Sequence, residues 1–306
     1  MNQSALPNAT MPEYQVDRKE RSRAIIAMLA AGLFFALMGI STRATHIANI
    51  VGTPIPALEV TCFRFAIGVA ILLPLQGRNG VNLLGNNRRR LVFRGIIGSF
   101  AVLFYFMSLQ NTSIMHAQLL NYGSLFFAPF FALHFLKEKI TVRTGMAITI
   151  AIAGMALILS ASKAGGQTFA GDCYGLISGI LAGGAITEIR LLRQTESSLS
   201  IFFYLSLIGI FITLPLMLWF HPIWPTTTGW FYLLLMGISS CTAQLLMTFG
   251  YKYVRAAEGS LLTMTQIAYV SIASLFVFHE HFTFATIGGA LLILGSAYWL
   301  SAKGTN

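Results

Sequence analysis

The sequence NTSIMHAQLLNYGSLFFAPFFALHFLKEKIT occupies residues 111–141, and a stretch of equal length, YVRAAEGSLLTMTQIAYVSIASLFVFHEHFT, follows 142 residues later at 253–283. Both stretches begin with polar residues and continue as a long apolar run that contains small and hydroxyl side chains. Both end in a charged tip with a glutamate, Glu138 or Glu280, three residues before Thr141 or Thr283. Few residues are identical, so the hydropathy of the whole chain must show whether it is a doubled unit.

The composition indicates a membrane protein. Hydrophobic residues make up 56% of the 306 residues and charged residues only 10%, whereas soluble domains carry about 25% charged residues. Apolar runs close to 20 residues recur along the chain, and about 20 helical residues cross the hydrocarbon core of a bilayer. We therefore expect an all-α membrane protein with several transmembrane helices.

Ten apolar runs predict ten transmembrane helices. The first run is too long and too poorly bounded by a cleavage site to be a signal peptide. Residues 1–23 precede it and are predicted to form a disordered cytoplasmic tail that ends in the basic sequence DRKERSR. The predicted spans are 24–41, 55–75, 91–109, 115–136, 142–161, 173–192, 200–220, 230–250, 259–278 and 284–301.

The distribution of basic residues predicts the orientation of these spans. If the amino terminus is cytoplasmic, seventeen of the 20 Lys and Arg residues lie on the cytoplasmic side, as the positive-inside rule requires. Only Arg43 and Lys163 then lie outside, and Arg64 lies within a span. The excess of positive charge is thus explained by the membrane, which argues against nucleic-acid binding. Both termini are predicted to be cytoplasmic.

Ten spans in two halves leave five spans in each half. Because five is odd, the halves enter the membrane in opposite orientations and form an inverted repeat. The predicted organisation is a first five-helix repeat at 24–161, a Gly-rich linker at 162–172 and a second repeat at 173–302. Inverted repeats are typical of alternating-access carriers that hold the substrate between the halves near the midplane.

The repeated pattern of glutamate, threonine and glycines resembles the drug/metabolite transporter superfamily, and its ten-helix EamA type most closely. The residues that carry this resemblance are Glu138, Thr141, Gly145, Gly154, Glu280, Thr283, Gly288, Gly295, Arg64, Phe65, the segment Arg94-Gly95-Ile96-Ile97-Gly98, Asp172 and Arg190. The segments ALEVTCFRF and FRG also resemble amino-acid exporters and S-adenosylmethionine carriers of this superfamily. The sequence departs from the family at Ser271, where proline is common in both repeats and the first half has Pro129.

Three polar stripes predict the residues that bind substrate. At 100° per residue, Gln118, Asn121, Tyr122, Leu125 and Pro129 share one helix face. The repeat offset places a second stripe on the ninth span, and a third follows helical spacing on the eighth. Ordinary hydrogen bonds between membrane helices are the alternative explanation. The predicted substrate-binding residues are Gln118, Asn121, Tyr122, Ser240, Gln244, Met247, Thr263 and Gln266.

Charged residues in or beside the spans are candidates for a gate or a charge pair. Arg64 lies several turns inside the second span, where a cation is costly and is paired or functional. Either it pairs with Glu59 at the outer interface, or it contacts the substrate or a gate. Glu258 opens the ninth span near Arg255 and is a candidate for ion coupling. Pro129 is either a hinge or a tolerated kink.

The sequence predicts neither a cofactor nor a metal site. Cys62, Cys173 and Cys241 lie in apolar runs without metal-ligand spacing. Consecutive residues of His279-Glu280-His281 point in different directions. The chain has no P-loop and no HExxH sequence.

We therefore expect a secondary active or facilitative transporter in a plasma membrane, with the bacterial inner membrane favoured. Its partners are the lipid bilayer and a small polar or amphiphilic metabolite. The favoured substrate is an amino acid or related compound, and the favoured direction is export. S-adenosylmethionine-type uptake and cationic drug efflux remain alternatives, as do a non-transporting scaffold or receptor and an intramembrane enzyme. A coupling proton or other ion and a homodimer are left open.

Overall fold

The computed structural model describes residues 18–78, 81–112, 114–137, 141–161, 168–220, 222–278 and 284–302. Most of these residues are helical, and none of them forms a strand. The helices are α1 (Arg18–Thr45), α2 (Ala48–Val51), α3 (Ala57–Leu72), η1 (Leu73–Leu75), α4 (Arg88–Asn111), α5 (Ile114–Asn121), α6 (Ser124–Phe135), α7 (Val142–Ala161), α8 (Phe169–Leu192), α9 (Ser198–Trp219), α10 (Thr227–Gly250), α11 (Ala256–Phe278) and α12 (Phe284–Ala302).

Every predicted span coincides with helix, and the fourth span is divided into α5 and α6. Among the described residues, 6 helices are long and apolar enough to cross a membrane, namely α1, α3 with η1, α4, α8, α9 and α10. Shorter apolar segments lie in α7 and α12. The chain is an integral membrane protein of the all-α class, as predicted, and the number of ten crossings stays a prediction.

Several helices begin earlier than predicted, and α1 and α8 differ most from the predicted spans. Helix α1 begins at Arg18, within the predicted tail, and residues 1–17 lie outside the described residues. Helix α8 begins at Phe169, within the predicted linker, because the side chain of Thr168 accepts a hydrogen bond from the amide of Gly171 and caps the helix. Polar residues in a first helical turn are easily mistaken for a loop in the sequence.

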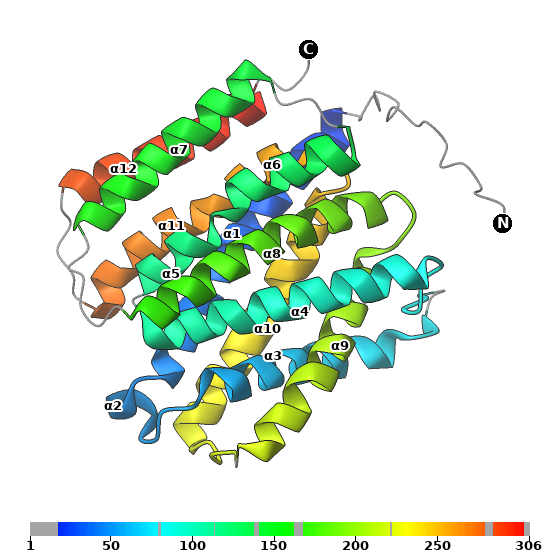
Figure 1. Cartoon of the computed structure of the whole chain (residues 1–306), viewed down its shortest axis with the longest axis vertical. Helices are drawn as coiled ribbons and strands as arrows, with labels where there is room; N and C mark the ends of the chain where they lie inside the picture. Colours follow the sequence, from blue (N-terminus) through cyan, green and yellow to red (C-terminus); the bar gives the residue numbers. More distant parts are fainter. Residues whose placement is uncertain are drawn as a thin grey trace.

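The helices pack in pairs, and the same pairing is seen when each helix is replaced by its counterpart in the other half (Figure 1). Helix α1 packs against α10 and α11, and its counterpart α8 packs against α4 and against α5 and α6. Helix α3 contacts α9, while α7 and α12 lie side by side at one edge of the molecule. The α3–α9 and α7–α12 contacts therefore join corresponding helices of the two halves. Each of the other contacts has a matching contact between the corresponding helices.

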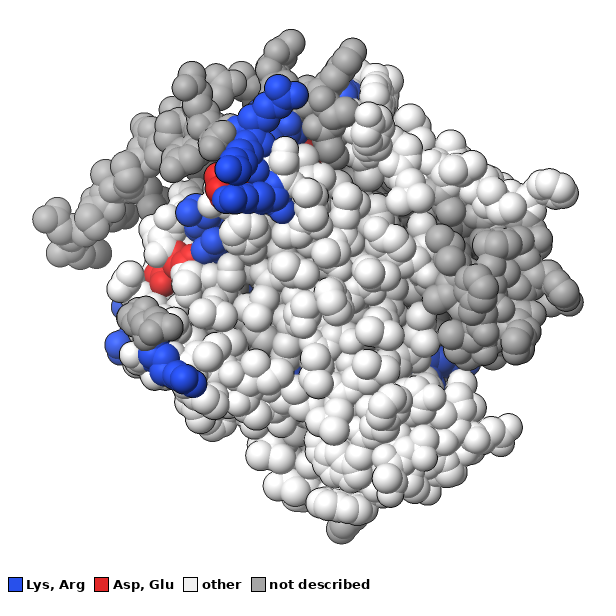
Figure 2. Space-filling view, turned by 180° about the vertical axis from the view of Figure 1, so that it is seen from behind, with Lys and Arg blue, Asp and Glu red and all other residues white. Residues whose placement is uncertain are grey.

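Charged and apolar residues divide the surface. Figure 2 shows Lys and Arg gathered along one side of the molecule, while most of the remaining face is uncharged. Exposed basic residues include Arg23, Arg88 and Arg89, which lie at the ends of α1 and α4. Large apolar side chains such as Phe211 and Phe231 are exposed on α9 and α10. This arrangement suits a protein whose sides face lipid and whose charges lie at the aqueous interface.

Candidate functional site

A buried cavity of about 140 Å³ lies among α1, α3, α4, α5, α6, α8, α9, α10 and α11. Apolar residues such as Phe35, Met38 and Leu205 form part of its wall. Its polar lining consists of Arg64, Arg94, Tyr105, Gln118, Asn121, Tyr122, Ser124, Gln244, Thr263 and Gln266. The cavity therefore combines an apolar wall with convergent polar groups, which is the usual construction of a small-molecule site.

The structure brings together seven of the eight residues predicted to bind substrate. Gln118, Asn121, Tyr122, Gln244, Met247, Thr263 and Gln266 all line the cavity. Ser240 does not line it. Ser240 is fully buried on α10 one turn before Gln244, and its hydroxyl has no hydrogen-bond partner among the described residues.

The fourth span is interrupted where it meets the cavity. Helix α5 ends at Asn121, and the amide of Gly123 donates to the carbonyl of Leu120 at 3.0 Å, which is a tighter turn than an α-helix makes. Ser124 then begins α6. On α8, a Cβ added at Gly179 would lie 2.6 Å from the carbonyl oxygen of Leu120. The missing side chain of Gly179 allows the interrupted backbone to approach α8 closely.

Side-chain hydrogen bonds connect the interrupted segment to neighbouring helices. The hydroxyl of Tyr122 donates to Oε1 of Gln266 at 2.9 Å, and Nε2 of Gln266 donates to the carbonyl of Phe35 at 3.2 Å. Nδ2 of Asn121 donates to the hydroxyl of Ser178 at 2.6 Å, which donates to a carbonyl of α4. The cavity wall thus joins α5 to α11 and to α8.

Arg64 does not form the predicted pair with Glu59. Oε1 of Glu59 instead accepts a hydrogen bond from the amide of Ile223 at 2.9 Å, and no ion pair between the two side chains exists in the described structure. The Arg64 guanidinium lines the cavity and lies 5.6 Å from the ring centre of Phe106. Long side chains on a helix usually lean toward its amino terminus, and this direction would bring Arg64 toward Glu59. The tertiary packing of α3 places the group in the cavity instead.

Arg94 is a cavity residue that the sequence analysis assigned only to the cytoplasmic charges. Its side chain is 3% exposed and lines the cavity. A Cβ added at Gly98, one turn further along α4, would clash with Nη1 of Arg94, so the guanidinium lies across this glycine. The spacing of arginine and glycine four residues apart in Arg94-Gly95-Ile96-Ile97-Gly98 was the available signal.

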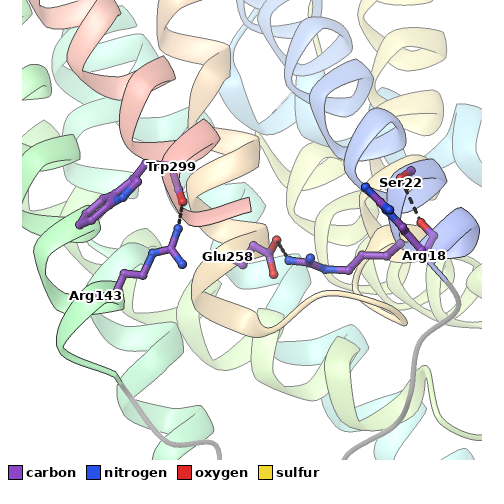
Figure 3. Close-up of polar contacts among 6 residues, drawn as sticks. Arg18, Ser22, Arg143, Glu258 and Trp299 are labelled. Carbon is purple, nitrogen blue, oxygen red and sulfur yellow. Dashed lines mark hydrogen bonds and ion pairs between the residues drawn. The ribbon is translucent and has the colours of Figure 1, made fainter. Parts of the chain in front are cut away.

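Glu258 pairs with an arginine of the amino-terminal helix. Its Oε1 lies 2.8 Å from Nη2 of Arg21, and both side chains are largely buried. Figure 3 shows this contact between α1 and α11, on the same side of the molecule as Arg143 and Trp299. The sequence analysis had placed Glu258 near Arg255 and could not identify this partner, because Arg21 was assigned to the tail.

Pro129 does not mark the interruption of the fourth span. It lies inside α6, whereas the break between helices is at Tyr122 and Gly123. Pro129 is therefore separate from this break, and its assignment as a hinge or as a tolerated kink stays a prediction.

The residues His279, Glu280 and His281 lie outside the described residues. Elsewhere in the described chain there is no group of three or more His, Cys, Asp or Glu side chains arranged to hold a metal ion.

Comparisons with known proteins agree with this architecture. A pseudopaline exporter of Pseudomonas aeruginosa is 26% identical over 283 residues, which cover 92% of this chain and 96% of the relative. An S-adenosylmethionine uptake transporter of Rickettsia felis is 22% identical over 276 residues, with 87% and 90% covered. A solved crystal structure with 19% identity covers 93% of this chain and 99% of its own, at a TM-score of 0.76, so the fold is shared.

The family comparison covers both halves of the chain. Residues 22–160 and residues 169–302 each match the EamA-like transporter family. The relatives in this family are transporters of small metabolites and not enzymes. Because the two matches together span nearly all of the described residues, the chain belongs to the EamA-like transporter family.

Proposed function

We propose that this protein is a secondary carrier that exports a small polar metabolite, an amino acid or a related compound, by alternating access. The observation that carries the proposal is a cavity whose polar lining comes from α3, α4, α5 and α6 of the first half and from α10 and α11 of the second. A site that needs both halves is suited to a mechanism in which the halves move against each other.

The depth of the cavity supports this mechanism. Arg64 is the eighth residue of α3, and Arg94 is the seventh residue of α4. At a rise of 1.5 Å per residue, each lies roughly 10 Å from the first residue of its helix. In the proposed topology α3 starts at the outer surface and α4 at the cytoplasmic surface. Both arginines therefore lie well inside the membrane, and the cavity between them is near the midplane.

The proposed topology is an inverted repeat with both termini in the cytoplasm of a bacterial inner membrane. The exchanged helix contacts, α1 with α10 and α8 with α4, support the repeat. Single cysteines at Asn87 and Ser197 should react with an impermeant reagent from the cytoplasmic side, and a cysteine at Pro225 from the outside. Labelling of all three from one side would contradict the topology.

Glu258 and Arg21 are proposed as a cytoplasmic latch. The ion pair joins α1 of the first half to α11 of the second, so separation of the halves on this side would break it. Glu258→Gln should favour the state that is open to the cytoplasm, and a charge exchange, Arg21→Glu with Glu258→Arg, should restore the original balance. Cysteine accessibility at the cavity residue Ser124 measures the change. Equal accessibility in all variants would show that this ion pair does not act as a latch.

The relatives bear on substrate and direction. The similarity to a pseudopaline exporter favours export, whereas the similarity to an S-adenosylmethionine transporter favours uptake. Cationic drug efflux is the weakest alternative, because the described cavity lining contains two arginines and no carboxylate.

The decisive experiment is flux through the purified protein in proteoliposomes, measured over amino acids, carboxylic acids, S-adenosylmethionine and cationic dyes. We expect saturable flux of at least one polar metabolite and a loss of flux in Gln244→Ala, whose side chain lines the cavity. Thr242→Ala is the matched control, because Thr242 is on the same helix with its hydroxyl bonded to its own helix backbone. Absence of flux for every compound would favour the scaffold or receptor function.

A further inference from the structure

We propose that Arg64 and Arg94 form a binding site for a metabolite that carries two carboxylates, with one guanidinium for each. The inference rests on the proposed transport function and replaces the amino acid as its substrate class with a dicarboxylate. It starts from the observation that two arginines from different helices line one buried cavity. Their side chains are 4% and 3% exposed.

Each guanidinium has at least one buried N–H group without a partner in the described protein. Nε of Arg64, and Nε and Nη1 of Arg94, are buried without a hydrogen-bond partner among the described residues. Buried polar groups are almost always hydrogen-bonded, and a buried charge without partners is more costly still. Two such groups that face the same cavity indicate a ligand with strong acceptors.

The direction of the Arg94 side chain strengthens this inference. Long side chains on a helix usually lean toward its amino terminus, which for Arg94 is the end with the exposed residues Arg88 and Arg89. Snorkelling in that direction would take the charge toward water. The guanidinium instead lies across Gly98, one turn deeper in the helix. The guanidinium of Arg94 therefore lies in the cavity although its side chain could extend toward water.

The charges around the cavity do not neutralise the two arginines. The titratable side chains that act on Arg64 include Cys241 and Tyr105, which are neutral at pH 7. Glu188 attracts Arg94, but its carboxylate is shared with Arg90, whose Nη1 lies 3.9 Å away. Arg90 is exposed, so water screens its charge, and the single carboxylate of Glu188 leaves the two arginines with a net positive charge. The described cavity lining itself holds both guanidinium groups and no carboxylate.

The chemistry of the remaining lining fits a dianion better than a zwitterion. A guanidinium offers a planar fork that binds a carboxylate with two parallel hydrogen bonds. Gln118 supplies further unpartnered amide atoms at the cavity, and so does Nε2 of Gln244. No carboxylate lines the described cavity, so an ammonium group would have no charged partner there. Two carboxylates on a short carbon chain match the two forks.

The first test uses the unmodified protein. Its thermal unfolding in detergent is measured with glutarate, with glutarate monomethyl ester and with glutaramide, which have similar shapes and two, one or no negative charges. We expect glutarate to stabilise the protein at a concentration roughly 10- to 100-fold lower than the monoester, the factor that one hydrogen-bonded charge provides. Equal stabilisation by glutarate and its monoester would overturn the proposal.

The second test uses variants of the two arginines whose folding is checked by their unfolding temperature without ligand. Arg64→Gln and Arg94→Gln should each abolish the preference for glutarate over its monoester, and lysine at either position should restore it only in part. Arg89→Gln is the control, since Arg89 is exposed on the same helix as Arg94. Loss of the preference in Arg89→Gln as well would contradict a local site.

The two proposals fail in different ways. If proteoliposomes transport a neutral or zwitterionic metabolite and glutarate neither competes nor stabilises, the transport function stands and the dicarboxylate site is wrong. If glutarate stabilises the protein as expected but no compound crosses the membrane, the site stands and the transport function is wrong.

Discussion

The fourth and ninth spans are placed alike in the two halves, yet their backbones differ. The fourth span is divided into α5 and α6 at Tyr122 and Gly123, whereas α11 is continuous from Ala256 to Phe278. The offset of 142 residues places Gly123 opposite Thr265, whose hydroxyl donates to the carbonyl of Leu262 at 2.7 Å within its own helix. A repeat can thus keep its packing while one copy gains a break beside the cavity.

Neighbouring helices are adapted to this difference. Gly179 on α8 faces backbone carbonyls of the interrupted segment. On α1, a Cβ at Gly32 would meet mainly a side chain, Oγ1 of Thr265 at 2.7 Å. Backbone that is not helical in the membrane is tolerated when it is buried in protein or lines a cavity, and here Asn121 and Tyr122 do line the cavity.

The largest expected effect distinguishes the two glycines. Gly179→Ala should lower the free energy of unfolding in detergent by about 1–3 kcal/mol, because its Cβ would overlap a fixed carbonyl 2.6 Å away. Gly32→Ala should cost less, because a threonine side chain moves more easily than backbone. Gly184→Ala is the control, since its nearest neighbours would be 3.9 Å away or more. Equal losses for Gly179→Ala and Gly184→Ala would show that the close approach is unimportant.

The second prediction concerns the break itself. Alanine favours a continuous helix over glycine by about 1 kcal/mol, so Gly123→Ala should shift the fourth span toward the form seen in α11. If transport needs the break, flux should fall about fivefold, the population shift that this energy produces. Thr265→Ala, at the corresponding position of the continuous helix, should transport normally. If both variants transport as fast as the unmodified protein, the break has no role in transport.

The break also explains how far the sequence could predict the site. Gln118, Asn121 and Tyr122 follow one helical face up to the end of α5, and all three line the cavity. The same face was extended to Leu125 and Pro129, which do not line it, while Ser124 does. A tight turn changes the phase of the helix, and periodicity alone carries no information about such a turn.

The arginines show a second limit. Arg94 was counted with the cytoplasmic charges, because counting basic residues gives the side of the membrane and not the depth of a side chain. Arg64 was recognised as unusual, but its partner depended on how α3 packs against other helices. Composition and apolar runs were sufficient to predict the all-α membrane fold, because both are properties of the sequence and do not depend on how the helices pack.

The third prediction concerns the hydrogen bond that joins the broken span to the continuous one. Tyr122→Phe removes the donor to Gln266 and leaves a buried oxygen without a partner, which should cost about 1 kcal/mol in unfolding free energy. Tyr298→Phe, at an exposed position, should have no measurable effect. In the double variant Tyr122→Phe/Gln266→Ala, the two losses should be less than additive. Strict additivity would show that the two side chains do not interact.

The smallest effect is expected at a pair of corresponding positions, Asn121 and Thr263. The amide of Asn121 reaches Ser178 on another helix at 2.6 Å, whereas the hydroxyl of Thr263 donates to the carbonyls of Gly259 and Ser260 in its own helix. Those carbonyls also accept backbone hydrogen bonds in a continuous helix, so Thr263→Val should change the unfolding free energy by less than about 0.5 kcal/mol. Asn121→Leu should cost about 1 kcal/mol, because it breaks a contact between α5 and α8. Chemical unfolding in mixed micelles can resolve this difference. A larger loss in Thr263→Val than in Asn121→Leu would show that the continuous helix, and not the interrupted one, depends on its polar side chains for packing.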